Sequence, residues 1–166
     1  MPDRRPVDIE EYVRRSRAGP CFICALVRGE PVHPQEIVYE DDLAIAFLSL
    51  FQVLRGYTLV APRQHREHVT ADFSPDEYLQ LQRVVYLVGD AVRRAVPTER
   101  LYVLSLGSQE GNGHVHWHLA PLPPGVPYEE QQLEALRLES GVFDLSGAEL
   151  SDLAETIRAE IAADAR

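Results

Sequence analysis

The sequence predicts an α+β protein built on an antiparallel sheet of about five strands, with one long helix between two of them. Three observations support this fold class. Short apolar segments are bounded by turn residues, one long amphipathic pattern separates the third segment from the fourth, and the links are short. The order strand, strand, strand, helix, strand, strand with such links favours an antiparallel sheet.

Five segments are expected to be strands because they are short and apolar, and are separated by turn signals. Asp41-Asp42 marks the first turn and Arg55-Gly56 a looser one. The expected strands are residues 36–40, 43–48, 57–61, 101–106 and 114–120.

The long helix is expected to start at Ser74-Pro75, because proline is favoured at the first helical position. Its apolar residues recur at helical spacing to about Ala95, before Pro97. A short charged helix is expected at the N-terminus, over residues 6–17, ending at Gly19-Pro20.

Two weaker helices are expected near the C-terminus, over residues 128–138 and 148–163, after the proline-rich segment 121–127. Their leucine and isoleucine spacing is most simply explained by packing onto the sheet or onto a partner subunit. The chain has 166 residues, 45% of them hydrophobic, so we expect a single domain over residues 1–166.

The overall charge limits the classes of partner. A formal net charge of −10 argues against nonspecific binding to a nucleic acid polymer or to an anionic membrane. All 16 basic residues are arginine, so lysine has no catalytic role here. No apolar run approaches the roughly 20 residues that a membrane span needs, and the first residues lack a signal core. We therefore expect a cytoplasmic protein.

The most informative segment for chemistry holds three histidines, His114, His116 and His118, alternating with apolar residues. On a strand, alternation places the three imidazoles on one face and Val115, Trp117 and Leu119 on the other. Packing alone does not explain three histidines on one strand. Two functional interpretations remain open: a three-histidine metal site of the hydrolytic zinc type, or a nucleophilic histidine between two orienting neighbours.

The two cysteines, Cys21 and Cys24, lie three residues apart and are typical of metal ligands or of a redox pair in a reducing compartment. A complete zinc site needs two more ligands. His65 and His68 lie too far downstream, and too close to each other, for a zinc finger. The alternative is a pair of buried thiols that never bind a metal. His33, beside Pro34, is expected to be a solvated loop residue.

The histidine run resembles that of the histidine triad family, whose members are nucleotide hydrolases and transferases. The resemblance extends to other segments in the family's order, and it covers about residues 20–125, leaving 126–166 as a C-terminal helical extension. These segments are Cys21-Phe-Ile-Cys24, Gly29-Glu30, Ile37-Val-Tyr-Glu-Asp-Asp42, Ala46-Phe-Leu48, Gly56-Tyr-Thr-Leu-Val-Ala-Pro62 and His65.

The resemblance implies a ligand set for one structural zinc ion per chain. Its members are Cys21, Cys24, His65 and His114, with His68 as a substitute ligand. It also implies a two-fold homodimer.

The resemblance further implies that His116 attacks the α-phosphate of a nucleoside phosphate derivative and forms a covalent nucleotidyl-histidine intermediate. His116 would need its far nitrogen held by a backbone carbonyl, which we expect from the adjoining strand. His118 would donate to a phosphate oxygen or bridge the attacking water.

The same resemblance gives the substrate-binding residues and two departures. Backbone N–H groups of Gly111, Asn112 and Gly113 are expected to cradle the phosphate. Ser49 stands where the family usually has an acid that binds both ribose hydroxyls, so ribose recognition is in doubt. Ser105 and Gly107 stand where Asn-x-Gly is common, Asn112 stands where Gln is common, and this loop is about two residues shorter.

The sequence thus predicts a zinc-containing nucleotide hydrolase or nucleotidyl transferase. One rival is a hydrolase with a single catalytic metal on His114, His116 and His118. The other is a nucleotide-binding or interaction protein without turnover. The base and the leaving group of the substrate are left open.

Overall fold

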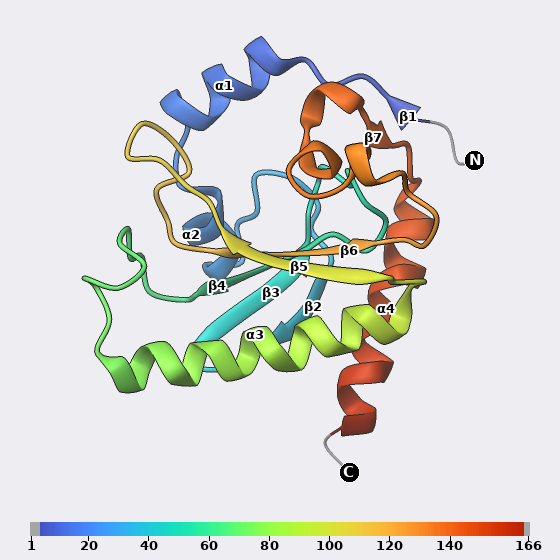
Figure 1. Ribbon diagram of the computed structural model, residues 1–166. Coiled ribbons are helices and arrows are strands. Elements are labelled where there is room, and N and C mark those ends of the chain that lie inside the picture. The colour runs from blue at the N-terminus through green and yellow to red at the C-terminus, as the bar shows by residue number, and fades with distance from the viewer. Residues whose placement is uncertain (1–3, 165–166) are drawn as a thin grey trace.

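A computed structural model describes residues 4–164 of the chain. Its main sheet has five antiparallel strands in the spatial order β2-β3-β4-β6-β5 (Figure 1). The strands are β2 (Ile37–Glu40), β3 (Ala44–Leu48), β4 (Thr58–Pro62), β5 (Arg100–Ser105) and β6 (Trp117–Leu122). This antiparallel sheet, with one long helix between β4 and β5, confirms the predicted α+β fold class.

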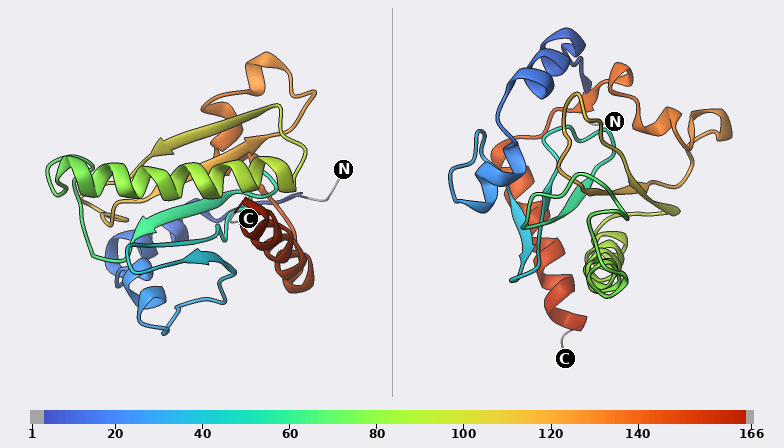
Figure 2. Two further views of the ribbon diagram at one scale, coloured as in Figure 1. Left: turned by 90° about the horizontal axis from the view of Figure 1, so that it is seen from below. Right: turned by 90° about the vertical axis from the view of Figure 1, so that its left-hand side faces the viewer.

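Helices cover both faces of the sheet. Helices α3 and α4 pack on one face and α2 packs on the other (Figure 2). Helix α1 lies on the same side as α2, with none of its residues buried (Figure 1). The four helices are α1 (Ile9–Ala18), α2 (Phe22–Val27), α3 (Pro75–Ala95) and α4 (Gly147–Asp164). None of these helices combines the length and the apolar character that crossing a bilayer requires, in the part of the chain described.

Helix α3 begins and ends as the sequence predicts. The Ser74 hydroxyl accepts from the Glu77 N–H at 3.2 Å, and the Glu77 carboxylate accepts from the Ser74 N–H at 2.7 Å. This reciprocal cap satisfies two backbone donors at the start of the helix. The apolar face of α3 packs on Trp117 and Leu119 of β6, which gives the larger hydrophobic core.

Helix α2 is short and was not predicted. It packs Ile23 and Leu26 on the opposite face of the sheet, against Phe47 of β3 and Leu59 of β4. The Cys21 thiol caps its start by accepting from the Cys24 N–H at 3.4 Å. Packing of α2 therefore brings both cysteines to the face that carries His118.

The predicted strand over residues 114–120 begins later, at Trp117. The backbone before Trp117 does not continue the ladder of main-chain hydrogen bonds. The Val115 N–H donates to the Arg66 carbonyl at 2.7 Å, and the His116 carbonyl accepts from the Ser105 hydroxyl at 2.7 Å. The loop after β4 and a side chain of β5 thus replace the ladder that would have started the strand at residue 114.

The predicted helix over residues 128–138 is wrong. Three short 3₁₀ turns occupy this region: Tyr128–Glu130, Glu134–Leu136 and Leu138–Ser140. Gln132 has a φ of 58°, which a helix excludes, and its N–H donates to the Tyr102 hydroxyl at 3.0 Å. Leu136 and Leu138 pack on the core beside Leu122, so tertiary packing overrides helix propensity here.

A second, two-stranded sheet was also not predicted. It pairs β1 (Arg4–Arg5) with β7 (Val142–Phe143) in antiparallel register, joining the start of the described chain to the segment before α4. The other terminal elements lie close to their predicted positions. Helix α1 begins three residues later than the predicted 6–17 segment, and α4 extends the predicted 148–163 helix by one residue at each end.

Candidate functional site

The three triad histidines share one side of their segment, as the alternation predicts. Val115 and Trp117 point into the core beneath α3, whereas His118 lies opposite Leu59 on the other face of the sheet. Only His118 lies within β6, because the strand starts at Trp117. The predicted orientation is confirmed, although the strand carries only one of the three histidines.

His114 is brought together with Cys21, Cys24 and His65. The ligand atoms of these four residues all lie within 4.8 Å of one another. The Cys21 thiol is 3.4 Å from His114 Nδ1, and the Cys24 thiol is 3.3 Å from His65 Nδ1 and 3.5 Å from His114 Nδ1. The structure therefore assembles the four residues that the sequence resemblance suggested as a ligand set.

Both imidazoles of this cluster are turned so that Nδ1 faces the thiols. The opposite nitrogen of each ring has an oxygen partner: His114 Nε2 lies 2.8 Å from the Pro62 carbonyl, and His65 Nε2 lies 3.0 Å from a Glu67 carboxylate oxygen. A ring that donates its Nε2 proton keeps a lone pair on Nδ1. Second contacts of this kind are typical of metal-binding histidines.

The spacing of the donor atoms fits a tetrahedral zinc ion. Zinc bonds of about 2.3 Å to sulfur and 2.0–2.1 Å to nitrogen place these atoms about 3.6 Å apart. The sulfur–nitrogen distances of 3.3–3.5 Å are close to this value. Burial lowers the pKa of His114 to about 4, so the ring is neutral at neutral pH, as a ligand must be.

The Cys24 thiol keeps its proton at neutral pH. Burial, and then the hydrogen bond and charge of Cys21, raise the pKa of Cys24 to about 11. A divalent cation would supply the positive charge that thiolates need. His68 pairs instead with Asp72, at 3.4 Å, and His33 lies 3.4 Å from Arg15. Neither histidine belongs to the cluster.

His116 is held with one nitrogen occupied. Its Nδ1 lies 2.7 Å from the His114 carbonyl, and 5% of the residue is exposed. The sequence analysis expected this carbonyl to come from the adjoining strand, which is wrong, since it belongs to a residue two positions earlier. Burial lowers the pKa of His116, so its ring is neutral and its Nε2 carries a lone pair.

His118 has a different partner, the phenol of Tyr57. The hydroxyl oxygen lies 2.7 Å from His118 Nδ1, and the two rings are stacked with centroids 5.7 Å apart. The rings of His116 and His118 are also close, with centroids 4.7 Å apart. Burial, and then the neighbouring His116, lower the pKa of His118 to about 4. Both rings are therefore neutral and lie side by side.

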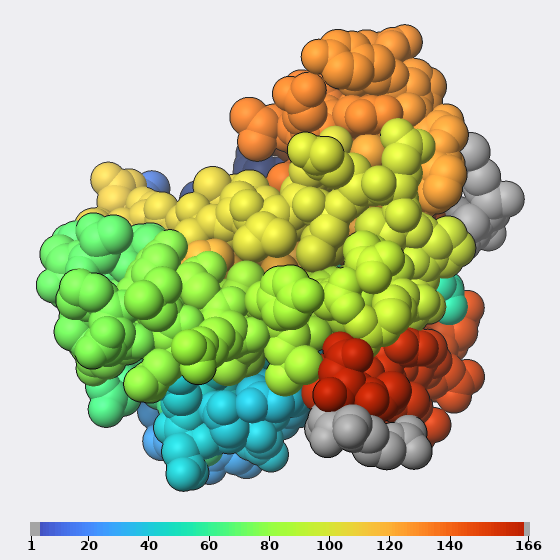
Figure 3. Space-filling view, turned by 60° about the horizontal axis from the view of Figure 1, so that its bottom comes forward, coloured from blue at the N-terminus to red at the C-terminus, as the bar shows by residue number. Residues whose placement is uncertain are grey.

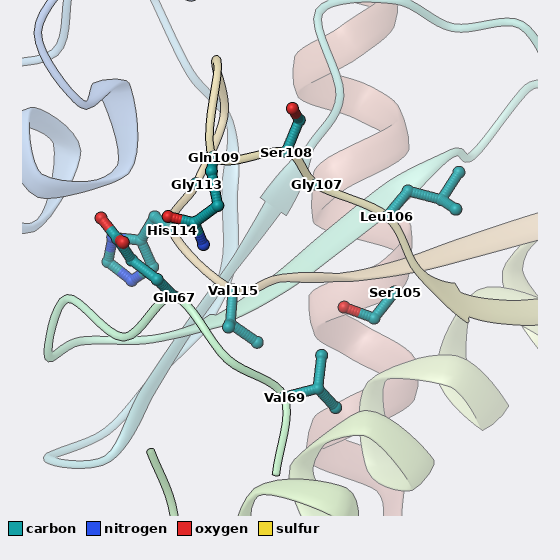
Figure 4. Close-up of a pocket in the computed structure, with 10 residues that line it drawn as sticks. All are labelled: Glu67, Val69, Ser105, Leu106, Gly107, Ser108, Gln109, Gly113, His114 and Val115. Carbon is teal, nitrogen blue, oxygen red and sulfur yellow. The ribbon is translucent and has the colours of Figure 1, made fainter. Parts of the chain in front are cut away.

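Four of the predicted site residues line a pocket of about 210 Å³: Ser105, Gly107, Gly113 and His114 (Figure 4). Glu67, Val69 and Val115 also contribute to its lining. His116 and His118 are not among the residues that line this pocket. The Ser105 hydroxyl donates to the His116 carbonyl, so Ser105 supports the triad backbone from this side.

The predicted phosphate loop is tied to helix α1. The Gly111 N–H donates to the Ser108 carbonyl at 3.1 Å, so it is engaged within the loop. The Asn112 amide donates to the Tyr12 hydroxyl at 3.0 Å, and Tyr12 packs edge-on against Phe51 at 5.2 Å. Helix α1 thus contacts the loop next to the triad, an arrangement that the sequence did not predict.

Ser49 is buried and engaged in a local turn. Its hydroxyl accepts from the Phe51 N–H at 3.1 Å. The Gln52 amide donates to the carbonyls of Ser49 and Tyr57, both at 2.8 Å, and accepts from Gly56. Each polar atom of the Gln52 side chain has a backbone partner, so Gln52 stabilises the turn. No group of Gln52 is left to bind ribose in place of the family's acid. The Asp41 carboxylate similarly caps the turn before β3.

Tyr57 and Glu67 are the site residues that the sequence analysis missed. Tyr57 precedes a predicted strand, but its contact with His118 depends on how β4 pairs with β6. In that register Thr58 lies opposite Leu119 and Leu59 opposite His118, so Tyr57 is a diagonal neighbour of His118. Glu67 gave a weak signal, because an acid two residues after His65 can orient its ring.

A comparison with protein families matches residues 30–124 to the HIT domain. Among curated proteins, an uncharacterized HIT-like protein of Saccharolobus solfataricus is 32% identical over 125 residues, covering 69% of this chain and 88% of that protein. Adenosine 5′-monophosphoramidase hnt1 of Schizosaccharomyces pombe is 27% identical, over 70% of this chain and 92% of that protein.

A solved structure shares the fold. The crystal structure of a Zn-bound histidine triad family protein from Mycobacterium smegmatis superposes with a TM-score of 0.66 at 21% identity. The match covers 87% of this chain and 95% of that protein. The agreement extends beyond the HIT domain match to most of the chain.

Proposed function

Because this chain belongs to the HIT domain family, we propose that it is a nucleotide hydrolase or nucleotidyl transferase that uses His116 as its nucleophile. The proposed substrate is a nucleoside phosphate derivative, attacked at its α-phosphate. The relative in Schizosaccharomyces pombe, an adenosine 5′-monophosphoramidase, supports this class of substrate.

The observation that carries the proposal is the bond between His116 Nδ1 and the His114 carbonyl, at 2.7 Å. This bond fixes the proton on Nδ1 and leaves the Nε2 lone pair as the reactive position. A neutral nitrogen nucleophile avoids the repulsion that an anion would meet at a phosphorus surrounded by anionic oxygens. The Ser105 hydroxyl donates to the His116 carbonyl, and this bond fixes the backbone that carries the ring.

The proposed reaction has two displacements. In the first, His116 Nε2 forms a bond to the α-phosphorus, and the bond to the leaving group breaks with its electron pair on the leaving group, which takes a proton from solvent. In the second, water bonds to phosphorus, the phosphorus–nitrogen bond breaks, and one water proton is released. The products are the leaving group and a nucleoside monophosphate, and the neutral imidazole is restored.

The geometry favours this reaction over a hydrolase with one catalytic metal on three histidines. His114 turns its Nδ1 toward the cysteine thiols, whereas His116 and His118 have other partners for their Nδ1 atoms. Among residues 4–164 the only group of potential metal ligands that includes a triad histidine is the cysteine–histidine cluster. The rival would also leave both cysteines without a role.

We propose that the cluster of Cys21, Cys24, His65 and His114 binds one structural zinc ion. Two thiolates and two neutral imidazoles are a common donor set for such an ion. The zinc would connect α2 to the segment that carries the nucleophile, because His114 is two residues before His116. A reducing cytoplasm would keep both thiols available, and we propose this location.

We propose that two copies of the chain form a homodimer through β5 and α3. Strand β5 is an edge strand, and Val103 on it is 50% exposed. Tyr86 of α3 is 76% exposed and lines a shallow apolar hollow with Leu79. Figure 3 shows α3, in green, running beside the yellow β5 surface. An edge strand next to exposed apolar side chains is typical of an interface.

The proposed function is tested with adenosine 5′-phosphoramidate. We expect the intact mass of the protein, after brief exposure and acid quench, to increase by one adenylyl group, with AMP released on longer incubation. AMP release without an adduct, abolished by a chelator, would favour the metallohydrolase. Nucleotide binding with neither adduct nor AMP would instead indicate a binding protein, and either result would contradict the proposal.

A further inference from the structure

We infer that Tyr57 is a positioning residue that donates its hydroxyl proton to His118 Nδ1 and so fixes the His118 proton on Nε2. The contact is short, 2.7 Å between oxygen and nitrogen, and the two rings are stacked. Tyr57 is buried, with 8% of the residue exposed. The stacked Tyr57 ring and this hydrogen bond together hold the His118 ring in one orientation.

The direction of this hydrogen bond follows from comparing the strengths of the two donors and the two acceptors. Within residues 4–164, His118 Nδ1 is the only hydrogen-bond partner of the Tyr57 hydroxyl, and His118 Nε2 is buried with no partner. Either direction leaves one donor and one acceptor unused: the Tyr57 proton and the Nε2 lone pair if His118 donates, or the Nε2 proton and a phenol lone pair if Tyr57 donates. The phenol O–H is the stronger donor and the imidazole nitrogen is the stronger acceptor. Donation from Tyr57 therefore makes the stronger hydrogen bond and leaves the weaker pair unused.

Two further features agree with this direction. Burial raises the pKa of Tyr57, so its phenol keeps the proton that it donates. The Leu106 carbonyl raises the pKa of His118, as a hydrogen-bond acceptor does, although it makes no hydrogen bond of standard geometry with the ring. Because Nδ1 is already engaged, a nearby carbonyl is compatible with a proton on Nε2.

The N–H on Nε2 has a use that rests on the proposed function. The His118 ring lies beside the nucleophile His116, with ring centroids 4.7 Å apart. A phosphoryl oxygen on a phosphorus bound at His116 would be an acceptor of suitable charge for this N–H. The atom is screened from solvent, so we infer that its acceptor arrives with the substrate. No proton is transferred, because loss of the Nε2 proton would create an imidazolate beside a neutral phenol.

The proton position can be measured without substrate, by ¹⁵N NMR of the histidine rings in the metal-loaded, full-length protein. His118 is assigned by the signal lost in His118→Gln. We expect His118 to be protonated on Nε2, with Nδ1 shifted as a hydrogen-bond acceptor. In Tyr57→Phe the Nδ1 signal should move to that of an acceptor without a partner. A proton on Nδ1 in the wild-type protein, or an unchanged Nδ1 signal in the variant, would overturn the inference.

Kinetics test the consequence for the reaction. We expect Tyr57→Phe to lower kcat about 10- to 100-fold, as loss of an orienting partner does, with KM within about twofold. The matched control is Tyr102→Phe, which removes a hydroxyl that bonds the Gln132 N–H and should change neither kcat nor the His118 signals. An unchanged kcat in Tyr57→Phe would overturn the positioning role. If the wild-type protein forms no adduct and no AMP, the proposed function fails. The NMR result still decides the direction of the hydrogen bond between Tyr57 and His118.

Discussion

His114 Nε2 lies 2.8 Å from the carbonyl oxygen of Pro62, the last residue of β4. This bond selects the ring nitrogen that faces the thiols, because a ring that donates from Nε2 has its lone pair on Nδ1. It also fixes the backbone of His114, whose carbonyl holds the Nδ1 of His116 at 2.7 Å. The metal cluster and the proposed nucleophile are therefore positioned by one segment of chain anchored to the end of β4.

The first prediction concerns the metal. Protein purified without added metal should contain roughly one zinc per chain by elemental analysis, because two thiolates and two imidazoles complete a tetrahedral site. The double variant Cys21→Ser, Cys24→Ser should lose it and unfold at a lower temperature, since α2 is no longer connected to His114. The matched control is His68→Ala, which lies outside the cluster and should keep its zinc. Zinc that persists without the cysteines and disappears in His118→Ala would favour a metal site on the triad.

The second prediction concerns the nucleophile. His116→Ala should lower turnover by about a thousandfold or more and abolish the nucleotidyl adduct, because the lost nitrogen forms the covalent bond. Its zinc content and circular dichroism should match those of the wild-type protein. His118→Ala should cost less, about a hundredfold, as expected for a group that stabilises charge. Wild-type turnover in His116→Ala would show that the assignment is wrong.

The third prediction concerns ribose. Ser49 stands where the family usually has an acid, and its hydroxyl is engaged with the Phe51 backbone. We therefore expect weak discrimination between ribonucleotides and 2′-deoxyribonucleotides, measured as a ratio of kcat/KM values. Ser49→Asp should raise that ratio about ten- to a hundredfold, because a charge-assisted hydrogen bond contributes roughly 1.5–3 kcal/mol.

Ser49→Ala is the control for ribose recognition, and it should leave the ratio unchanged if the serine makes no contact with the sugar. A strong ribose preference in the wild-type protein would mean that another residue binds the sugar. Gln52 is a poor candidate, because its amide atoms are engaged with backbone groups. Asp41 is engaged as well, since its carboxylate accepts from Leu43 and Ala44.

The fourth prediction concerns stability and pH. Burial lowers the pKa of His118 from 6.5 to about 4 in the folded protein. Between these values the unfolded chain binds a proton that the folded protein does not, so the free energy of unfolding falls as the pH is lowered from 6.5 to 4. The effect of this one group is at most about 1.4 kcal/mol per pH unit. Above pH 6.5 it has no effect.

Urea unfolding of the wild-type protein and of His118→Gln, at several values between pH 4 and 7.5, isolates this contribution. His114 and the metal cluster titrate in both proteins, so their effects cancel in the difference. We expect the variant to lose less stability between pH 6.5 and 4, and the two proteins to respond alike above that range. Parallel curves throughout would show that the folded-state pKa of His118 is not lowered.

The fifth prediction concerns assembly. Light scattering should give a dimer, and Val103→Glu with Tyr86→Glu should give a monomer, because the charges would be buried without partners between β5 and α3. Val32→Glu is the control, since Val32 is 54% exposed and lies on neither element. A dimer that survives the double substitution would place the interface elsewhere, and a wild-type monomer would exclude it.

The sequence by itself determined the elements whose signals are local. Ser74-Pro75 followed by Glu77 specifies where α3 begins, because the cap involves only residues within one turn. Alternation of His118 with Trp117 and Leu119 specifies which side of the sheet each faces. The ligand set of Cys21, Cys24, His65 and His114 came from resemblance rather than from spacing, and the structure brings these four residues together.

Only the tertiary structure decided features that depend on contacts between distant segments. The Val115 N–H bonds to Arg66, so the strand begins at Trp117 rather than at His114. The region from Tyr128 to Ser140 forms short turns, because packing on the core outweighs a propensity difference of less than about 1 kcal/mol per residue. Tyr57 reaches His118 through the register between β4 and β6. Local sequence does not encode that register, which is fixed when the two faces of the sheet are buried.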